Sequence, residues 1–249
     1  MTRFTILGVP VDALTESEAV DWVARAIDDG RPRLVISVNP ERIMHAGRDP
    51  AFAAVLRNAD LALADGAGVL WAARRLGHPL PGRVAGVDLV KALAARGATA
   101  GWRFFFLGGS PGVAEAAGQV LGDAYPGFVL AGAAAGSPEP AADDATTEAV
   151  RSSRAQVLLL AYGAAAEEAW LARNLERSGA VIGLGVGGAF DFISGRARRA
   201  PPWMREHGLE WLHRLGRQPW RWRRMLALPR FVVRVLGQPR QEGPAEGSP

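Results

Sequence analysis

A single carboxylate, Asp65, stands where a short apolar segment gives way to a helical pattern in ADGAGVLWAARR (residues 64–75). Gly66 and Gly68 follow it and leave room for a ligand to approach the carboxyl group. An aspartate at the end of a strand can act as a general base that removes a proton from a substrate hydroxyl. It can equally cap the backbone N–H groups of the following helix. The residues alone leave both interpretations open.

Two glycine-rich turns could hold the phosphates of a ligand. Gly108, Gly109 and Ser110 follow the apolar segment RFFFL, and Gly187 and Gly188 follow VIGLGV. Glycine lets a phosphate come close to the backbone, and the N-terminus of a following helix attracts its negative charge. The first turn matches neither the G-x-G-x-x-G pattern nor the lysine-containing P-loop pattern. The alternative for it is a tight turn before a helix that Ser110 caps.

Three charged residues near these segments could also contact a ligand. Asp191, in GVGGAFD, could accept hydrogen bonds from a base or a ribose, or from backbone N–H groups of its own turn. Arg83 and Asp88, in GRVAGVD, could supply a cation and a second carboxylate near Asp65, or form a surface ion pair. The sequence alone does not separate the binding role from the structural one.

The chain lacks the residue patterns that hold metals. It contains no cysteine, which excludes disulfides and thiolate ligands, and its four histidines show no ligand spacing on a common face. No D-x-D element occurs either. We therefore expect neither a metal nor a cofactor.

Apolar segments alternate with helical patterns along most of the chain. RLVISVN (33–39), LALAD (61–65) and RFFFLG (103–108) are typical strands, and helical segments of roughly 10 to 15 residues separate them. This alternation predicts a Rossmann-like α/β fold, a mostly parallel sheet with helices on both faces. Such sheets bind ligands at the carboxyl ends of their strands. The polar residues expected there are Ser37, Asn39, Asp65, Gly108–Ser110, Glu167, Glu168 and Gly187–Asp191.

The composition changes at Arg196. Residues 196–240 contain twelve arginines against two acidic residues, with tryptophans in between, and the last segment is rich in proline and glycine. We expect an α/β catalytic domain over residues 1–195, a helical appendage over 196–237 and a disordered tail over 238–249. The appendage suits an anionic membrane surface. Packing onto the domain and binding to nucleic acid are the alternatives.

Length and hydropathy restrict the class of protein. With 249 residues, 49% of them hydrophobic, the chain can form one α/β domain with an appendage. Its N-terminus lacks a signal-peptide pattern, and its apolar runs are shorter than the roughly 18 to 20 residues of a membrane-spanning helix. We expect a cytoplasmic protein that is peripheral on the inner face of the cell membrane.

Taken together, these segments resemble the bacterial glycosyltransferases of the WecG/TagA/CpsF family (glycosyltransferase family 26). The resemblance extends from Thr5 to Leu236 without a large gap. It is carried by SVNPERI (37–43), ADLALADGAGVLWAARRLGHPLPGRVAGVDL (59–89), FFFLGGSPGVAEAA (104–117) and GVGGAFDFISGRARRAPPWMREHGLEWLHRL (185–215).

The resemblance implies an inverting, metal-independent glycosyltransferase. Such an enzyme moves N-acetylmannosamine, its uronic acid or a related sugar from a UDP-sugar to a polyprenyl-diphosphate-linked sugar, in the synthesis of cell-surface polysaccharides. The aspartate that is the base in this family corresponds to Asp65, its T-x-N-P-E segment to residues 37–41, and its conserved arginine to Arg83. The arginines that would contact the lipid diphosphate are Arg214, Arg221 and Arg224.

One segment departs from the family pattern. Where the family has G-x-P-K-Q-E, residues 163–168 read GAAAEE, so Glu167 replaces a glutamine thought to contact substrate. An amide both donates and accepts hydrogen bonds, but an ionised carboxylate only accepts them and would repel a diphosphate. Three consequences are open: a different donor sugar, pairing of Glu167 with an arginine, or weakened activity.

Besides the three arginines for the lipid diphosphate, the expected site has two groups of residues. We expect Asp65, Arg83 and Glu167 to be catalytic. The residues expected to bind substrate are Ser37, Asn39, Asp88, Gly108, Gly109, Ser110, Gly187, Gly188 and Asp191. The alternative function is a non-catalytic protein that binds a sugar nucleotide or a polyprenyl phosphate. We expect no nucleic-acid partner, and a homo-oligomer is compatible with the sequence.

Overall fold

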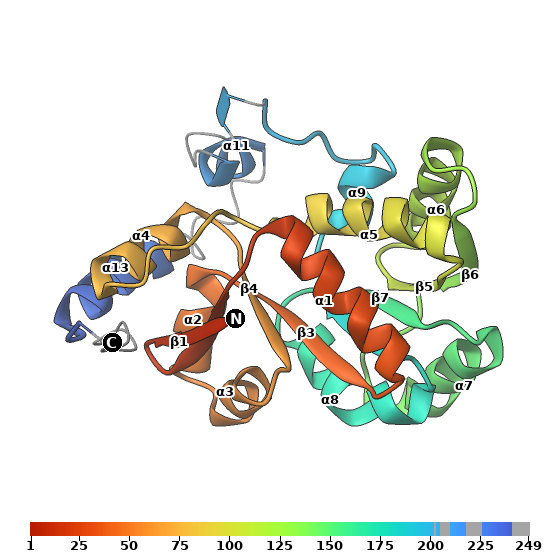
Figure 1. Ribbon diagram of the computed structural model, residues 1–249, viewed down its shortest axis with the longest axis horizontal. Helices are drawn as coiled ribbons and strands as arrows, with labels where there is room; N and C mark the ends of the chain where they lie inside the picture. Colours follow the sequence, from red (N-terminus) through yellow and green to blue (C-terminus); the bar gives the residue numbers. More distant parts are fainter. Residues whose placement is uncertain (202, 205–209, 218–225, 241–249) are drawn as a thin grey trace, which may run out of the picture.

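The computed structural model describes residues 1–201, 203–204, 210–217 and 226–240 (Figure 1). Its elements in chain order are β1 (Thr2–Ile6), β2 (Val9–Ala13), α1 (Glu16–Asp29), β3 (Arg33–Val38), α2 (Pro40–Ala46), α3 (Pro50–Arg57), β4 (Leu61–Ala64), α4 (Ala67–Leu76), α5 (Gly86–Ala100), β5 (Arg103–Gly108), α6 (Val113–Ala124), β6 (Val129–Ala134), the 3-10 turn η1 (Pro140–Ala142), α7 (Asp143–Ser153), β7 (Val157–Ala161), α8 (Ala166–Ser178), β8 (Ile182–Gly185), α9 (Ala189–Ile193), α11 (Glu210–Arg217) and α13 (Ala227–Gly237).

The strands form one sheet in the order β1-β2-β4-β3-β8-β7-β5-β6. The hairpin of β1 and β2 is antiparallel, and its turn contains Leu7 and Gly8, both with positive φ. All the other neighbouring strands pair in parallel. The prediction of a mostly parallel α/β sheet is therefore confirmed.

Helices cover both faces of the sheet, as the alternating pattern predicts (Figure 1). The helices α1, α5, α6 and α9 pack on one face, over a core that includes Leu63, Phe104, Phe106 and Leu184. On the other face, α2, α3 and α4 pack over the half of the sheet that contains β1 and β2, and α7 and α8 pack over the half that contains β5 and β7. The central strands β4 and β8 are thereby buried, whereas the edge strand β6 is half-buried along its length.

The predicted cap of α6 is wrong. This helix begins at Val113, and its N-cap is Gly112, which has a φ of +81°. Ser110 lies two residues earlier in the turn, where its carbonyl oxygen accepts a hydrogen bond from the Val113 N–H at 3.0 Å. The left-handed conformation of Gly112 reverses the chain into the helix, so the Ser110 hydroxyl is not required for capping.

Part of the arginine-rich tail packs onto the α/β domain. The helix α13 lies against α2 and α4, and its Phe231 and Val235 are buried in the core there. The Gln238 side chain accepts a hydrogen bond from the Leu7 N–H at 2.9 Å and donates one to the Thr5 carbonyl at 3.3 Å. The helix α11 lies on the same side of the molecule as α9 (Figure 1). Within the described ranges, no helix has the length and apolar character needed to cross a membrane.

The packing of α13 predicts unequal effects on stability for two apolar residues of this helix. Phe231 is 1% exposed and Val233 is 70% exposed. Phe231→Ala should lower the free energy of unfolding by about 3–5 kcal/mol, because it leaves a cavity beneath the helix. Val233→Ala should change it by less than about 0.5 kcal/mol. Urea unfolding of both variants measures the difference, and equal effects would show that α13 is not anchored through Phe231.

Candidate active site

The carboxyl ends of β4, β3, β8, β7 and β5 are adjacent along one edge of the sheet. The chain leaves β3 and β7 toward helices on one face, and leaves β8 and β5 toward helices on the other face. At such a point α/β proteins generally bind ligands, in a crevice outside the carboxyl ends of the strands. We call this part of the sheet edge the strand-end crevice. The predicted residues at Ser37–Asn39, Asp65, Gly108–Ser110 and Gly187 all lie at these ends.

Asp65 follows β4 directly and is half-buried. Its backbone N–H donates to the Val38 carbonyl at 2.8 Å, and its carboxylate lies 3.5 Å from the Ser37 hydroxyl. The helix α4 has Gly66 as its N-cap, with a φ of +97°, and no side chain in the described part of the chain caps it. The capping interpretation of Asp65 is therefore wrong, and its carboxylate faces the neighbouring strand end instead.

Asn39, by contrast, has a structural role. Its Oδ1 accepts a hydrogen bond from the Arg42 backbone N–H at 3.0 Å and caps α2, with Pro40 in the first turn of the helix. This use of the side chain leaves the amide NH₂ of Asn39 able to donate to a ligand. Its half-buried position beside Ser37 is compatible with both roles.

Arg83, in the segment before α5, and Asp88, in the first turn of α5, approach the same edge. The Val84 N–H donates to the Ala64 carbonyl at 2.8 Å, which places Arg83 beside the end of β4. Asp88 accepts hydrogen bonds from the Arg199 guanidinium, one of them at 2.7 Å. Burial raises the pKa of the nearby Glu16, the charge of Asp88 raises it further, and Arg199 opposes them. Asp88 thus pairs with the segment that leads into the tail, which the sequence did not indicate.

The two glycine-rich turns are held by neighbouring strands. Gly108 has a φ of +107°, and a Cβ there would lie 2.7 Å from the Ala161 carbonyl carbon, so only glycine fits. The Gly109 N–H donates to the Ala161 carbonyl at 3.0 Å, and Ser110 is exposed. The turn after β8 contains Gly187, with a φ of +53°, followed by the exposed Gly188.

Asp191 lies in the first turn of α9 and is half-buried. Its backbone carbonyl accepts hydrogen bonds from the Ala197 N–H at 2.8 Å and from the Ser194 hydroxyl at 3.3 Å. These bonds use the main chain and leave the carboxylate available to a ligand. Both structural and binding roles remain compatible with its position.

Glu167 is 0% exposed and forms an ion pair with Arg42, which is 6% exposed. Its Oε2 accepts hydrogen bonds from the Gly163 N–H at 3.2 Å and the Gly187 N–H at 3.1 Å. Burial raises the pKa of Glu167 to about 7, although the Arg42 guanidinium opposes this shift. Of the three consequences that the Glu167 substitution left open, the structure shows the pairing with an arginine.

Sequence reasoning missed Arg42 as the partner. It lies in the quoted SVNPERI segment, but an arginine that follows a helix cap is ordinarily exposed. Here its Nη1 donates to the Ser37 carbonyl at 2.8 Å, and its Nη2 lies 2.8 Å from the carboxylate of Glu168. The only signal in the sequence was the charge of Glu167, which lies in the first turn of α8 close to the expected site.

Much of the predicted lipid-diphosphate site lies outside the described residues. Arg214 belongs to α11, whose backbone alone is described at this position, and Arg221 and Arg224 fall in the undescribed segment 218–225. The roles of these three arginines therefore stay predictions.

Among the described residues, no group of three or more histidines, aspartates or glutamates is placed to hold a metal ion.

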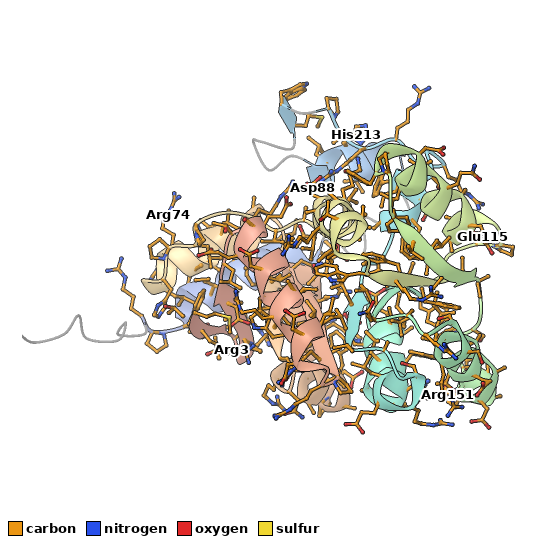
Figure 2. The ribbon with its side chains drawn as sticks, turned by 45° about the vertical axis from the view of Figure 1, so that its right-hand side comes forward. Arg3, Arg74, Asp88, Glu115, Arg151 and His213 are labelled. Atoms are coloured by element: carbon orange, nitrogen blue, oxygen red, sulfur yellow. The ribbon has the colours of Figure 1, made fainter. Side chains whose placement is uncertain are left out.

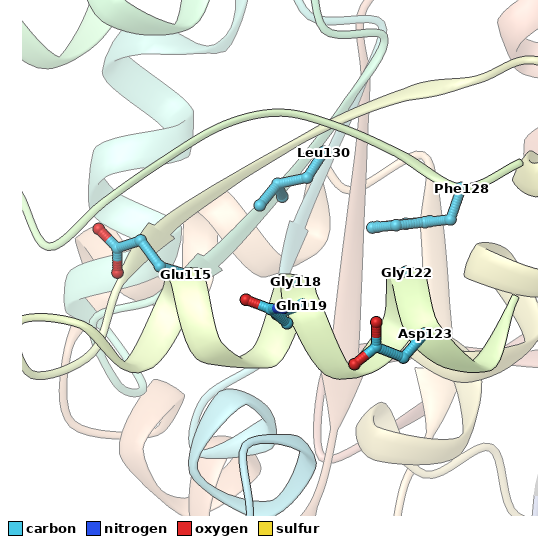
Figure 3. A pocket seen from close by; sticks show the side chains of 7 residues that line it. All are labelled: Glu115, Gly118, Gln119, Gly122, Asp123, Phe128 and Leu130. Atoms are coloured by element: carbon cyan, nitrogen blue, oxygen red, sulfur yellow. The ribbon is translucent and has the colours of Figure 1, made fainter. Parts of the chain in front are cut away.

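A shallow hollow lies elsewhere, between α6 and the segment that leads into β6 (Figure 3). Glu115 and Asp123 are among the residues that line it, together with Phe128 and Leu130. Two carboxylates would repel a diphosphate, and the expected site residues do not line this hollow. The strand-end crevice is therefore the better candidate for the active site.

Comparison with known proteins identifies the family of the chain. Residues 4–244 match the model of the glycosyl transferase WecG/TagA/CpsF family. An N-acetylglucosaminyldiphosphoundecaprenol N-acetyl-beta-D-mannosaminyltransferase of Bacillus spizizenii is 32% identical over 234 residues, which cover 91% of this chain and 90% of the relative. A protein of the same name from Bacillus subtilis is 31% identical over 239 residues, which cover 95% and 92%. The chain belongs to the WecG/TagA/CpsF family and is a glycosyltransferase.

Proposed function

We propose that this enzyme transfers N-acetylmannosamine or a related sugar from a UDP-sugar to a polyprenyl-diphosphate-linked sugar, with inversion and without a metal. The names of the two Bacillus relatives support the acceptor and the transferred sugar. The observation that carries the proposal is the Asp65 carboxylate, which lies beside the Ser37 hydroxyl among the ends of five parallel strands. A carboxylate at this position can meet a sugar hydroxyl that enters the crevice.

In the proposed reaction, Asp65 removes the proton from the acceptor hydroxyl. The acceptor oxygen then forms a bond to the anomeric carbon of the donor, on the face opposite UDP. The bond between the anomeric carbon and the diphosphate oxygen breaks, UDP leaves with the electron pair, and the proton passes from Asp65 to water. Asp65 is negatively charged before the step and neutral after it. The Ser37 hydroxyl donates a hydrogen bond to the charged carboxylate and thereby orients it.

The departing diphosphate requires positive charge or N–H donors. The turns at Gly108–Ser110 and Gly187–Asp191 lead into helices α6 and α9, whose first turns carry partial positive charge. Arg83, held beside the end of β4, supplies a full positive charge at the same edge. We place UDP across these turns and assign Arg214, Arg221 and Arg224 to the lipid diphosphate, since arginine pairs with phosphate through two hydrogen bonds.

A release assay distinguishes catalysis from mere binding. The purified chain is mixed with UDP-N-acetylmannosamine, UDP-N-acetylglucosamine or UDP-glucose and with a soluble lipid-diphosphate-linked N-acetylglucosamine, with and without EDTA. We expect UDP release that depends on the acceptor, is fastest with UDP-N-acetylmannosamine and is unchanged by EDTA. Donor binding by calorimetry without UDP release from any donor would favour the non-catalytic alternative.

The assignment of the base predicts unequal effects for two aspartates at the same edge. Asp65→Asn should lower kcat by on the order of 10²–10⁴, because the amide keeps the shape of the carboxylate but cannot take the proton. Asp191→Asn is the matched control and should change kcat much less, since Asp191 is placed to bind donor. A normal kcat for Asp65→Asn, or a larger loss for Asp191→Asn, would move the base to another residue.

We further propose that the enzyme is peripheral on an anionic membrane, and that α4 and α13 contribute to this contact. Their exposed apolar residues form a surface that we call the α4–α13 face, made up of Trp71, Leu226, Val232, Val233 and Leu236. Arginines lie on the same two helices and just after them, and Figure 2 shows Arg74 pointing outward from α4. Apolar side chains beside arginines suit the headgroup region of an anionic bilayer. We propose that residues 196–237 are the segment that binds the membrane.

A charge placed on the α4–α13 face should weaken membrane binding. Val233→Glu should lower binding to phosphatidylglycerol vesicles several-fold, because each charge near an anionic surface changes the binding free energy by about 1 kcal/mol. Val120→Glu makes the same change at an exposed valine of α6 and should bind like the wild type. Vesicle co-sedimentation measures both variants. Equal binding of Val233→Glu and the wild type would remove this face from the membrane contact.

A further inference from the structure

A buried ion pair lies directly behind the strand-end crevice. The Oε1 of Glu167, on α8, accepts a hydrogen bond from the Arg42 guanidinium, on α2. The Oε2 of Glu167 accepts the backbone N–H groups of Gly163 and Gly187, in the turns after β7 and β8. Arg42 also donates to the carbonyl of Ser37, at the end of β3. Two side chains thus join the ends of three adjacent strands.

We infer that Arg42 and Glu167 are positioning residues for glycosyl transfer, which hold the Gly187 turn and the Ser37 hydroxyl in the geometry that binds the donor beside Asp65. This inference rests on the proposed function. It gives Glu167 a role through the two turns, in place of a direct contact with substrate, because its side chain is completely buried and each of its oxygens already has a partner.

The surroundings of the pair fit this carboxylate closely. A Cβ on Gly185 would lie 2.9 Å from the carboxyl carbon of Glu167, so the glycine makes room for this side chain. Gly187 has a φ of +53°, and its N–H is turned toward the carboxylate. The last residue of β8 and the turn after it are thus shaped around Glu167.

An ion pair buried at this depth contributes little net free energy to the stability of the fold. Removing both charges from water costs about as much as their attraction returns, and apolar residues of similar volume often stabilise equally well. The contacts of the pair are with the strand ends that carry the candidate site. Its function is therefore better explained by the fixed position of those ends.

The donors around residue 167 require two hydrogen-bond acceptors: one faces the Arg42 guanidinium and the other faces the N–H groups of Gly163 and Gly187. In Glu167→Gln, the amide oxygen could accept the two turn N–H groups, but the amide NH₂ would then face the Arg42 guanidinium, donor against donor. Arg42→Met leaves the carboxylates of Glu167 and Glu168 buried without the cation that lies between them. In the double variant the NH₂ faces an apolar side chain, which relieves the clash. We therefore expect partial rescue in the double variant.

The test is a double-mutant cycle with Arg42→Met, Glu167→Gln and both changes together. We expect each single variant to raise the KM for the donor by roughly 10- to 100-fold, with a smaller change in kcat, since misplacing a binding group costs this much. The double variant should have a donor KM closer to the wild type than Glu167→Gln has. Unchanged KM values in the single variants, or KM effects that simply multiply in the double variant, would overturn the inference.

A second ion pair on the same helix is the matched control. Arg173 of α8 pairs with Asp143 at 2.9 Å and also donates to the Pro138 carbonyl at 2.9 Å, in the segment after β6, whereas the Arg42–Glu167 pair joins the turns after β7 and β8. Arg173→Met should lower the melting temperature without changing the donor KM. If Arg42→Met and Glu167→Gln behave in the same way, their role is only structural and the inference fails.

Hydrogen exchange separates this inference from the proposed function. In the enzyme without ligand, Glu167→Gln should speed amide exchange in residues 161–169 and 185–191 by about tenfold or more, while the rest of the sheet keeps the exchange of the wild type. This result would support positioning of the turns even if the chosen donors gave no UDP release. Unchanged exchange in both segments would overturn it, whatever the activity.

Discussion

The buried carboxylate of Glu167 is the constraint on which the arrangement of the strand ends depends. An ionised carboxylate in the interior is costly unless it is paired and hydrogen-bonded, and burial raises the pKa of Glu167 to about 7. Arg42 supplies the charge, and the turns after β7 and β8 supply N–H donors. A parallel sheet brings these three groups to the same edge, because all of its strands end there. The electrostatic requirement of one residue thereby fixes the conformation of two turns.

The same requirement accounts for the altered segment 163–168 as a unit. Ala165 has a φ of +71°, and its N–H donates to the Glu168 carboxylate at 2.9 Å. A proline can do neither, since its φ is fixed near −65° and it has no N–H. The two departures from the family pattern, Ala165 in place of proline and Glu167 in place of glutamine, are thus compatible changes in one local structure. The charge of Glu167 is met by the N–H groups of two turns and by an arginine, and its carboxylate is completely buried.

The sheet, and the edge at which its parallel strands end, could be predicted because they follow from local patterns. Alternating apolar and helical segments specify a parallel sheet, and a parallel sheet specifies where its loops meet. The pairs Arg42–Glu167 and Asp88–Arg199 could not be predicted, since their members lie 125 and 111 residues apart and meet only through the strand order. The predicted cap at Ser110 and the capping alternative for Asp65 failed for a different reason. Gly66 and Gly112 begin those helices with positive φ, and a sequence does not distinguish such a glycine from one that gives a ligand room.

Two of the alternatives for the arginine-rich tail, packing onto the domain and binding to a membrane, are compatible with each other. On α13, Phe231 and Val235 are buried against α2 and α4, whereas Val233 and Leu236 on the same helix are exposed. Phe231 also meets Trp71 of α4 edge to face, with ring centroids 6.5 Å apart. Packing onto the domain therefore does not compete with binding to a membrane, because a helix anchored on one side presents its other side in a fixed direction. Since α4 begins two residues after Asp65, a membrane held by the α4–α13 face would have a fixed position relative to the proposed base. A lipid-linked acceptor requires such an arrangement, because its diphosphate stays at the bilayer surface while its sugar must reach the crevice.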